Sequence, residues 1–281
     1  MTYRYTIYAS LTMRRPKKLF REWKHIRARV VRARRLFLFL DFDGTLAPIR
    51  PRPEQVRLSR AHRVLLERIR RGGAVLAIIS GRALPDIRRR AGLSGIWYSG
   101  AHGFFLLSPR NRRISLLTSS QRTHLERALR PLRRRLRGLR GIQLEPKQAT
   151  IAVHYRRAAA HRRKLAFHIV RELIRNDPRL KLLSGKKVWE ILPAARIDKW
   201  TAVRTILAYE KWRASKDLLF YVGDDTTDEA VFRKMKGIPV AVGKQRGTAA
   251  RYFLRSHREV RKLLERWDEI SLSASNKNHT S

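Results

Sequence analysis

The sequence contains no cysteine, which excludes disulfides, thiolate metal sites and a cysteine nucleophile. It also lacks a run of the roughly 18 apolar residues that a transmembrane helix needs. Its densest apolar runs, Leu36–Leu40 and Ala74–Ile79, have the length of buried strands. The N-terminus has no continuous apolar core between its charges and does not read as a secretory signal. We therefore expect a globular protein that resides in the cytoplasm.

Acidic residues are scarce: 22 Asp and Glu stand against 65 Lys and Arg, which gives a formal net charge of +43. Such a chain attracts phosphates, nucleic acid and anionic membrane surfaces without a specific site. Arginine is spread over the whole chain, however, which equally fits a general bias towards arginine on solvated faces. Charge alone therefore names no function and leaves nonspecific binding to nucleic acid or anionic membranes open.

The two ends of the chain differ from its middle. Residues 1–35 carry 12 Lys or Arg and a single acid, Glu22, and we interpret them mostly as a basic N-terminal arm. Ile26, Val30 and Val31 mark a weak amphipathic helix within that arm. Residues 271–281 read as a polar tail. The 281 residues suffice for one large domain or two moderate ones.

Continuous apolar runs predict strands that are buried on both faces, as in the centre of a parallel sheet. These runs are Leu36–Leu40, Ala74–Ile79, Leu218–Val222 and Ile238–Val242. Ser59–Arg71 predicts a helix with Val64, Leu65 and Ile69 as its apolar stripe. Polar residues follow the strands at their carboxyl ends. The pattern predicts an α/β protein with a doubly wound, Rossmann-like parallel-sheet core, assigned to residues 36–110 and 196–270.

Residues 111–195 show a different pattern, which predicts an inserted α+β lobe. Gln121–Leu139 and Ala158–Arg175 have helical spacing, although Pro131 lies where proline commonly kinks or splits a helix. Ala149–Tyr155 alternates as a strand with one exposed face does, with Ile151, Val153 and Tyr155 on the same side, and Val188–Leu192 predicts another short strand.

Asp41 and Asp43 follow the first apolar run directly, where the chain leaves the sheet. Two carboxylates aimed at one cavity repel each other and need a cation or a shared proton to coexist. A hard divalent cation with oxygen ligands meets that need. Gly44 then allows a close approach of the backbone, whose amides can form an anion-binding pocket.

The segment Asp41-Phe42-Asp43-Gly44-Thr45-Leu46 resembles the first motif of the haloacid dehalogenase-like phosphatases. Ser80 in Ser80-Gly81-Arg82 resembles their second motif, Lys199 their third, and Gly223-Asp224-Asp225-Thr226-Thr227-Asp228-Glu229 their fourth. All four motifs occur in the expected order.

This resemblance implies a mechanism. Asp41 would attack phosphorus to give an aspartyl-phosphate, and Asp43 would act as general acid and then general base. Mg²⁺ would be held by Asp41, the Asp43 carbonyl and Asp224, and Asp225 and Asp228 would orient those ligands. Ser80 and Lys199 would bind the remaining phosphoryl oxygens.

A closer resemblance, over residues 36–265, is to the trehalose-6-phosphate phosphatases. It is carried by Gly-Asp-Asp-x-Thr-Asp-Glu, by Gly100-Ala101-His102-Gly103, by Glu145-Pro146-Lys147 and by Gly185-Lys186-Lys187-Val188-Trp189-Glu190. In that family the inserted lobe is a cap that closes over the sugar. The resemblance implies that substrate-binding residues come from Arg82, His102, Gly103, Glu145, Lys147, His154, Arg156, Lys186 and Glu190.

The reaction implied is hydrolysis of trehalose 6-phosphate to trehalose and phosphate, the last step of trehalose biosynthesis. Sucrose-phosphate, mannosyl-phosphoglycerate and broad phosphosugar phosphatases share the fold and the chemistry and remain alternatives. An alternative of another class is a basic protein that binds nucleic acid or membrane surfaces on a disused phosphatase scaffold. That alternative predicts the loss of a catalytic group, whereas Asp41, Asp43, Ser80, Lys199 and Asp224 are all present.

Overall fold

The structure, a computed structural model, describes residues 15–185, 187–243 and 247–277. The described residues form two compact units: those up to residue 79, 90–96 and those from residue 203 onwards belong to the first, and those within 80–89 and 97–202 to the second. The boundaries predicted above for the core and the inserted lobe stay predictions. None of the helices among the described residues is both long and apolar enough to cross a membrane.

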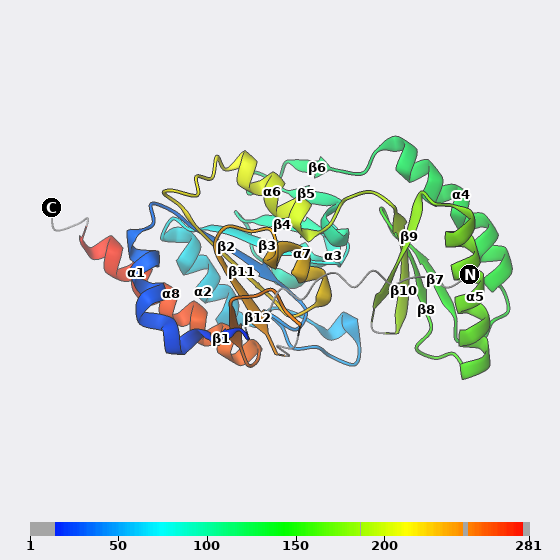
Figure 1. Cartoon of the computed structure of the whole chain (residues 1–281), viewed down its shortest axis with the longest axis horizontal. Coiled ribbons are helices and arrows are strands. Elements are labelled where there is room, and N and C mark those ends of the chain that lie inside the picture. Colours follow the sequence, from blue (N-terminus) through cyan, green and yellow to red (C-terminus); the bar gives the residue numbers. More distant parts are fainter. Residues whose placement is uncertain (1–14, 186, 244–246, 278–281) are drawn as a thin grey trace. The chain divides into compact units, whose positions relative to one another are not determined.

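Helices are interspersed with single strands and with pairs of consecutive strands along the chain (Figure 1). The α-helices are α1 (Trp23–Arg32), α2 (Arg60–Arg71), α3 (Leu84–Ala91), α4 (Ser119–Leu136), α5 (Ala160–Asn176), α6 (Lys199–Tyr209), α7 (Glu229–Phe232) and α8 (His257–Lys277). The strands are β1 (Lys17–Lys18), β2 (Leu36–Asp41), β3 (Val75–Ile79), β4 (Trp97–Gly100), β5 (Phe105–Leu107), β6 (Arg113–Ser115), β7 (Gln143–Pro146), β8 (Ile151–His154), β9 (Leu180–Gly185), β10 (Val188–Pro193), β11 (Leu218–Gly223), β12 (Ile238–Val242) and β13 (Tyr252–Leu254). Short 3-10 helices are η1 (Leu19–Glu22), η2 (Pro53–Gln55), η3 (Ala101–Gly103) and η4 (Thr226–Asp228).

The sheet of the first unit is parallel, with strand order β1-β13-β12-β11-β2-β3. The central strands β2 and β11 are buried over nearly their whole length, because helices and loops cover both faces. In β2 the side chains of Phe37, Leu38, Phe39 and Leu40 are at most 1% exposed. The predicted parallel α/β core is thereby confirmed.

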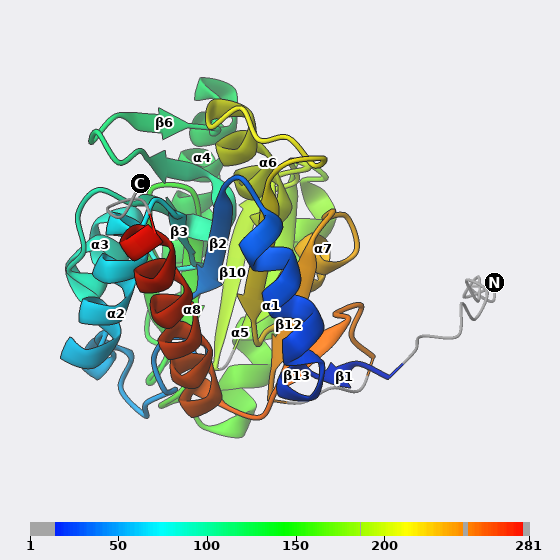
Figure 2. The same ribbon diagram turned by 90° about the vertical axis from the view of Figure 1, so that its left-hand side faces the viewer.

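Helices α2 and α8 pack side by side in this unit (Figure 2). Ser59 caps α2, because its hydroxyl accepts a hydrogen bond from the backbone N–H of His62. Leu66 and Ile69 face the core, whereas Val64, which we placed in the apolar stripe, is 38% exposed. The stripe prediction was therefore wrong at Val64: the buried positions lie three and four residues apart on another face of the helix.

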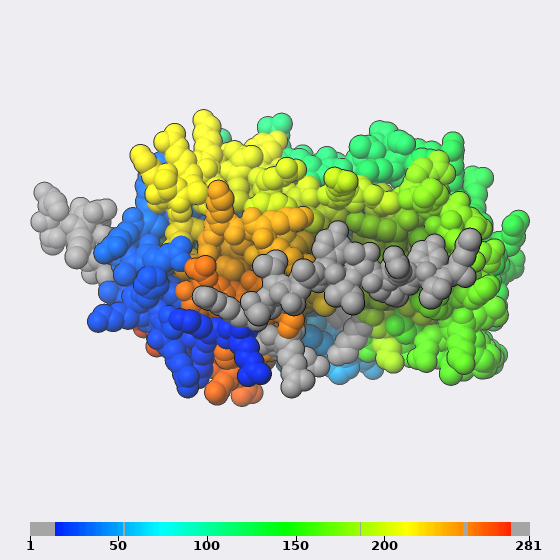
Figure 3. Space-filling model, in the orientation of Figure 1, coloured from blue at the N-terminus to red at the C-terminus, as the bar shows by residue number. Residues whose placement is uncertain are grey.

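The N-terminal segment is more ordered than the interpretation as an arm implies. Among the described residues, β1 pairs in parallel with β13, and η1 and α1 follow it. Leu19 and Ile26 are fully buried, Val30 is nearly so, and Val31 is exposed. The blue N-terminal residues lie against the orange residues around β13 in the space-filling view (Figure 3). Residues 17–32 thus belong to the fold, and residues 1–14 of the predicted arm lie outside the described residues.

The expected polar tail begins inside a helix. Helix α8 continues past Ser271 to Lys277, so most of this segment has helical backbone, and residues 278–281 lie outside the described residues. Upstream, Val260, Leu263, Leu264 and Trp267 are fully buried along α8. Their spacing of three and four residues places them on one helix face, which anchors α8 in the first unit.

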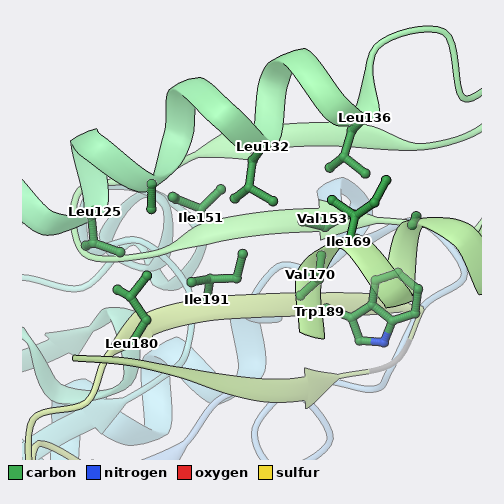
Figure 4. Packing of buried hydrophobic residues seen from close by; sticks show 12 residues of the cluster. Leu125, Leu132, Leu136, Ile151, Val153, Ile169, Val170, Leu180, Trp189 and Ile191 are labelled. Carbon is green, nitrogen blue, oxygen red and sulfur yellow. The ribbon is translucent and has the colours of Figure 1, made fainter. Parts of the chain in front are cut away.

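The second unit contains two antiparallel arrangements. One is β4-β5-β6, and the other is a sheet with strand order β7-β8-β10-β9. Helices α4 and α5 cover one face of the latter sheet. Leu132 of α4, Val153 of β8 and Trp189 of β10 belong to the hydrophobic core between the helices and the sheet (Figure 4). Helix α4 runs through Pro131 as one element, so this proline does not split it.

The register of this sheet fixes which residues face away from α4 and α5. Ala152 pairs with Glu145 on one side and with Glu190 on the other, and paired residues point to the same face. The neighbouring pair, Val153 and Trp189, points to the opposite face, towards the helices. There Tyr155 stacks on Trp189, with ring centroids 4.1 Å apart. The face opposite the helices therefore carries the acidic residues.

Candidate active site

An acidic cluster lies at the carboxyl ends of two neighbouring strands of the first unit. Strand β2 ends at Asp41, and Asp224 follows directly after β11. Because the two strands pair in parallel, their carboxyl ends meet at one edge of the sheet. Asp41, Asp224 and Asp228 each offer a carboxylate oxygen there, and these oxygens lie within 4.8 Å of one another. Asp41 and Asp228 are buried, and Asp224 is half-buried.

The loop after Asp41 folds tightly against this cluster. The Gly44 N–H donates to the Ala47 carbonyl at 2.7 Å, and the Thr45 hydroxyl donates to Asp224 Oδ1 at 3.3 Å. Gly44 adopts a φ of +91°, and a Cβ there would lie 2.0 Å from Asp224 Oδ2. Glycine is therefore required at this position both by backbone conformation and by the close approach to a carboxylate.

A buried tyrosine supports the third carboxylate. The Tyr221 hydroxyl donates to Asp228 at 2.6 Å, and the Asp225 N–H donates to its other oxygen at 3.0 Å. Burial, together with the charges of Asp228, Asp41 and Asp224, raises the pKa of Tyr221 well above 10. The phenol therefore stays protonated and remains a donor to Asp228 across the physiological pH range.

The donor set of the cluster fits a hard divalent cation. Three carboxylates at this spacing repel one another unless a cation or a proton lies between them, and Mg²⁺ prefers oxygen ligands. Asp41 and Asp224, both predicted ligands, belong to the cluster, and Asp228 adds a third carboxylate. Asp43, expected to contribute its carbonyl, is half-buried and bridged to Ala47, and Asp225 is exposed.

Ser80 opens the second unit and is almost fully buried. Its backbone N–H donates to the Ser99 carbonyl at 2.9 Å, and its hydroxyl accepts from the backbone N–H of Arg82 at 3.1 Å. The Arg82 guanidinium in turn donates to the carboxylate of Asp86 at 3.1 Å. These contacts hold Ser80 and its hydroxyl in one orientation in the loop after β3.

The turn Gly100–Gly103 connects Ser80 with the start of α6. Ala101 and His102 have φ values of 50° and 57°, a conformation that non-glycine residues rarely adopt. The His102 N–H donates to the Ser80 carbonyl at 3.3 Å. A Cβ on Gly103 would lie 2.5 Å from the Asp198 carbonyl, directly before Lys199, which is buried and begins α6. The turn thus positions the Ser80 and Lys199 segments within one unit.

Glu190 on β10 is the centre of a charged network in the second unit. Its carboxylate lies 2.6 Å from His102 Nε2 and 2.6 Å from Lys147 Nζ. Burial alone would raise the pKa of Glu190, but the hydrogen bonds and charges of His102 and Lys147 outweigh it and lower the pKa to about 2. Glu190 is therefore ionised at neutral pH, although only 8% of the residue is exposed.

The remaining residues predicted to bind substrate are more exposed. Glu145 and His154 form a pair with 2.7 Å between Oε2 and Nε2, on neighbouring strands β7 and β8. Arg156 is exposed after the end of β8, and Lys186 lies outside the described residues. Glu145 shares its sheet face with Glu190 through the register described above.

Some contacts of the site have no signal in the sequence. Tyr221 lies within an apolar strand and looks like a core residue, yet its hydroxyl holds Asp228. The pairing of His102 with Glu190 joins positions 88 residues apart. A motif identifies each residue by its neighbours in the chain, and it cannot report a partner at that distance.

Solved structures define the class of fold. The C-terminal domain of trehalose-6-phosphate phosphatase from C. albicans is similar with a TM-score of 0.73 at 24% identity, covering 92% of this chain and 99% of that domain. A haloacid dehalogenase-like hydrolase from Bacteroides thetaiotaomicron has a TM-score of 0.60 at 17% identity, covering 83% of this chain and 99% of that chain. The fold is therefore that of the haloacid dehalogenase-like hydrolases.

Sequence relatives define the family. The model of the trehalose-phosphatase family matches residues 39–258. A probable trehalose-phosphate phosphatase D from Arabidopsis thaliana is 30% identical, covering 87% of this chain and 71% of that protein. A trehalose-phosphate phosphatase from Mycobacterium ulcerans is 33% identical, covering 79% of this chain and 59% of that protein. The chain belongs to the trehalose-phosphatase family, which consists of phosphoric monoester hydrolases.

Proposed function

We propose that this protein hydrolyses trehalose 6-phosphate to trehalose and phosphate, as the last step of trehalose biosynthesis. The observation that carries the proposal is the cluster of Asp41, Asp224 and Asp228 beside the Gly44–Thr45 loop, in a chain of the trehalose-phosphatase family. Sucrose-phosphate and other phosphosugars stay as alternative substrates. Cytoplasmic residence and nonspecific binding to nucleic acid or membranes stay predictions from the sequence.

In the first step, a carboxylate oxygen of Asp41 attacks phosphorus and forms an aspartyl-phosphate. The bond between phosphorus and the sugar oxygen breaks, and the Asp43 carboxyl group donates its proton to that oxygen, which releases trehalose. In the second step, Asp43 takes a proton from water, and the resulting nucleophile attacks phosphorus. Phosphate leaves, and the Asp41 carboxylate is restored.

Asp41, Asp224 and the Asp43 carbonyl are the proposed ligands of Mg²⁺, with Asp228 and Asp225 orienting them. When bound, the metal would offset the negative charge between the Asp41 carboxylate and the phosphoryl group. Ser80 and Lys199 are proposed to bind the other phosphoryl oxygens. Their burial supports this role, because hydrogen bonds and charges act more strongly away from water.

The second unit is proposed to select the sugar. An ionised Glu190 is a strong acceptor for sugar hydroxyls, and Lys147 and His102 keep it ionised. Arg82, Gly103, Glu145, His154, Arg156 and Lys186 are the further candidates to contact the substrate. A site that hydrogen-bonds several hydroxyls rejects sugars that lack them, because its own polar groups would be left unpaired.

The test is release of inorganic phosphate from trehalose 6-phosphate, sucrose 6-phosphate and glucose 6-phosphate, with Mg²⁺ and with a chelator. We expect metal-dependent turnover that is fastest on trehalose 6-phosphate. Turnover of sucrose 6-phosphate alone would keep the mechanism and refute the substrate. If no sugar phosphate is hydrolysed in the presence of Mg²⁺, the enzymatic proposal fails and the binding-protein alternative gains support.

A further inference from the structure

The first unit contains a cavity of about 590 Å³ whose lining includes none of the three aspartates of the acidic cluster. We call it the α2–α8 cavity. Residues 46–59, His62 in α2, and residues 257–265 at the start of α8 contribute its walls. Its volume lies in the range of roughly 300–1,000 Å³ that is typical of sites for small molecules.

The walls of the α2–α8 cavity are strongly cationic. Its permanently charged residues are Arg50, Arg57, Arg258, Arg261 and Lys262. Glu265 is the acidic residue among the lining, and Arg261 donates to it at 2.9 Å. Helices α2 and α8 both begin at this cavity, and helix N-termini add partial positive charge. Like charges gathered around a hollow attract anions and are stabilised when one binds.

A buried imidazole with an unused ring nitrogen also lines the cavity. His62 is 6% exposed, and its Nδ1 lies 2.8 Å from the Ser59 hydroxyl. The Ser59 oxygen already accepts from the His62 backbone N–H at 3.2 Å, so the hydroxyl proton is free to point at Nδ1. In that tautomer Nε2 carries the imidazole proton. Within the described part of the chain, this buried Nε2 has no hydrogen-bond partner.

The two histidines of the cavity report the same electrostatic environment. Burial, followed by the charges of Arg261 and His257, lowers the pKa of His62. Burial, followed by the charges of Arg258 and Arg50, lowers the pKa of His257. Positive charge on either imidazole is therefore unfavourable, first because of burial and then because of the neighbouring cations.

We infer that the α2–α8 cavity binds a small organic anion that carries two or more phosphate groups, such as a nucleoside diphosphate. Four fixed cations besides the Arg261–Glu265 pair exceed what a single phosphate group can contact, and the cavity is larger than one phosphate requires. Leu46, Pro48 and Val56 form an apolar part of the wall that suits the uncharged part of such a molecule. This binding is independent of the proposed hydrolysis, because none of these residues is assigned to it.

Isothermal titration calorimetry with ADP tests the inference, with a chelator present and about 0.15 M salt to screen loose surface charge. The test variant is Arg50→Gln/Arg258→Gln, which removes two exposed cations of the cavity wall. The matched control is Arg163→Gln/Lys164→Gln, which removes two exposed cations from α5 in the second unit. Circular dichroism establishes that both variants are folded; Arg57→Gln/Lys262→Gln replaces the test variant if it is not.

We expect saturable binding of one ADP that weakens at least tenfold in the test variant and less than twofold in the control. Amide hydrogen exchange should slow at residues 46–58 and 257–262 when ADP is added. Equal weakening in both variants would show that ADP binds through net charge alone and would overturn the inference. Binding that neither variant changes would place ADP elsewhere and would overturn it as well.

Discussion

The two units surround their carboxylates in opposite ways. In the first unit, Asp41, Asp224 and Asp228 crowd their oxygens within 4.8 Å, which favours a shared cation. In the second unit, Glu190 lies between two basic side chains, His102 and Lys147, each 2.6 Å away. The negative charge of the first arrangement favours the binding of a cation, whereas the negative charge of Glu190 is balanced by basic side chains of the chain itself. Asp and Glu carry the same ionisable group, and the neighbours of each carboxylate decide whether its charge is balanced within the chain.

The largest effect is expected from Asp41→Asn, which removes the proposed nucleophile from the acidic cluster of Asp41, Asp224 and Asp228. Turnover of trehalose 6-phosphate should fall by roughly 10⁴-fold or more, because an amide does not form the acyl phosphate. Phosphate release at saturating substrate measures this. The variant should remain folded, since it relieves repulsion in the acidic cluster. Retention of a tenth of the activity would refute the role of Asp41 as nucleophile.

Gly44→Ala tests how tightly the loop after Asp41 must pack against the acidic cluster of Asp41, Asp224 and Asp228. The new Cβ would lie 2.0 Å from Asp224 Oδ2 in a backbone with φ of +91°. We expect activity to fall by about a hundredfold and stability by roughly 2–3 kcal/mol, measured by urea unfolding.

Gly73→Ala is the matched control for that change. Gly73 has a φ of +89°, but its added Cβ would meet no atom within 4 Å. It should therefore report backbone strain alone, of about 1 kcal/mol, and leave activity intact. Equal effects of the two substitutions would mean that contact with Asp224 is unimportant.

Mg²⁺ binding should distinguish the acidic cluster of the first unit from the Glu190 network of the second unit. At a hundredfold excess over its dissociation constant, a ligand of the folded state stabilises by about 2.7 kcal/mol. We expect MgCl₂ to raise the melting temperature of the protein, and Asp224→Asn to remove most of that rise. Glu190→Gln should leave it unchanged. A rise lost equally in both variants would contradict the assignment of the metal to the first unit.

The effect of Glu190→Gln on the stability of the fold should depend on pH. The pKa of Glu190 is lowered from 4.5 to about 2, so its ionised form stabilises the fold above pH 4.5. That stabilisation, roughly 3 kcal/mol from the size of this lowering, is lost as the pH falls from about 4.5 to 2. Urea unfolding at several pH values should show the difference between wild type and variant shrinking in that window.

Glu145→Gln provides the control for the pH experiment. Like Glu190, Glu145 pairs with a histidine, in this case His154, but the side chain of Glu145 is 50% exposed. Exposed ion pairs contribute less than about 1 kcal/mol, so this variant should unfold much like the wild type at every pH. A loss as large as that of Glu190→Gln would show that burial does not explain the strength of the Glu190 network.

Local patterns predicted the elements that are fully buried or strongly amphipathic. The run Leu36–Leu40 became β2, and Ile238–Val242 is β12 with the same limits, because an apolar run of this length has few other ways to avoid water. Weaker patterns were right in part. Ile26 and Val30 marked the helix that is α1, but the burial of Leu19 before it was not predicted, and Val64 faces solvent against the prediction. In a segment dense with basic residues, a single apolar residue such as Leu19 has no periodic pattern that reports its burial.

The sequence by itself determined the reaction class. Asp41, Asp43, Ser80, Lys199 and Asp224 occur in the order of a known family, and strand ends can be read from apolar runs. Only the tertiary structure decided which carboxylates share a space: it joined Asp228 to Asp41 and Asp224, and it paired Glu190 with His102 across 88 residues. The physical reason is that electrostatic interactions depend on distance in space, which folding sets and which the order of residues along a chain does not record.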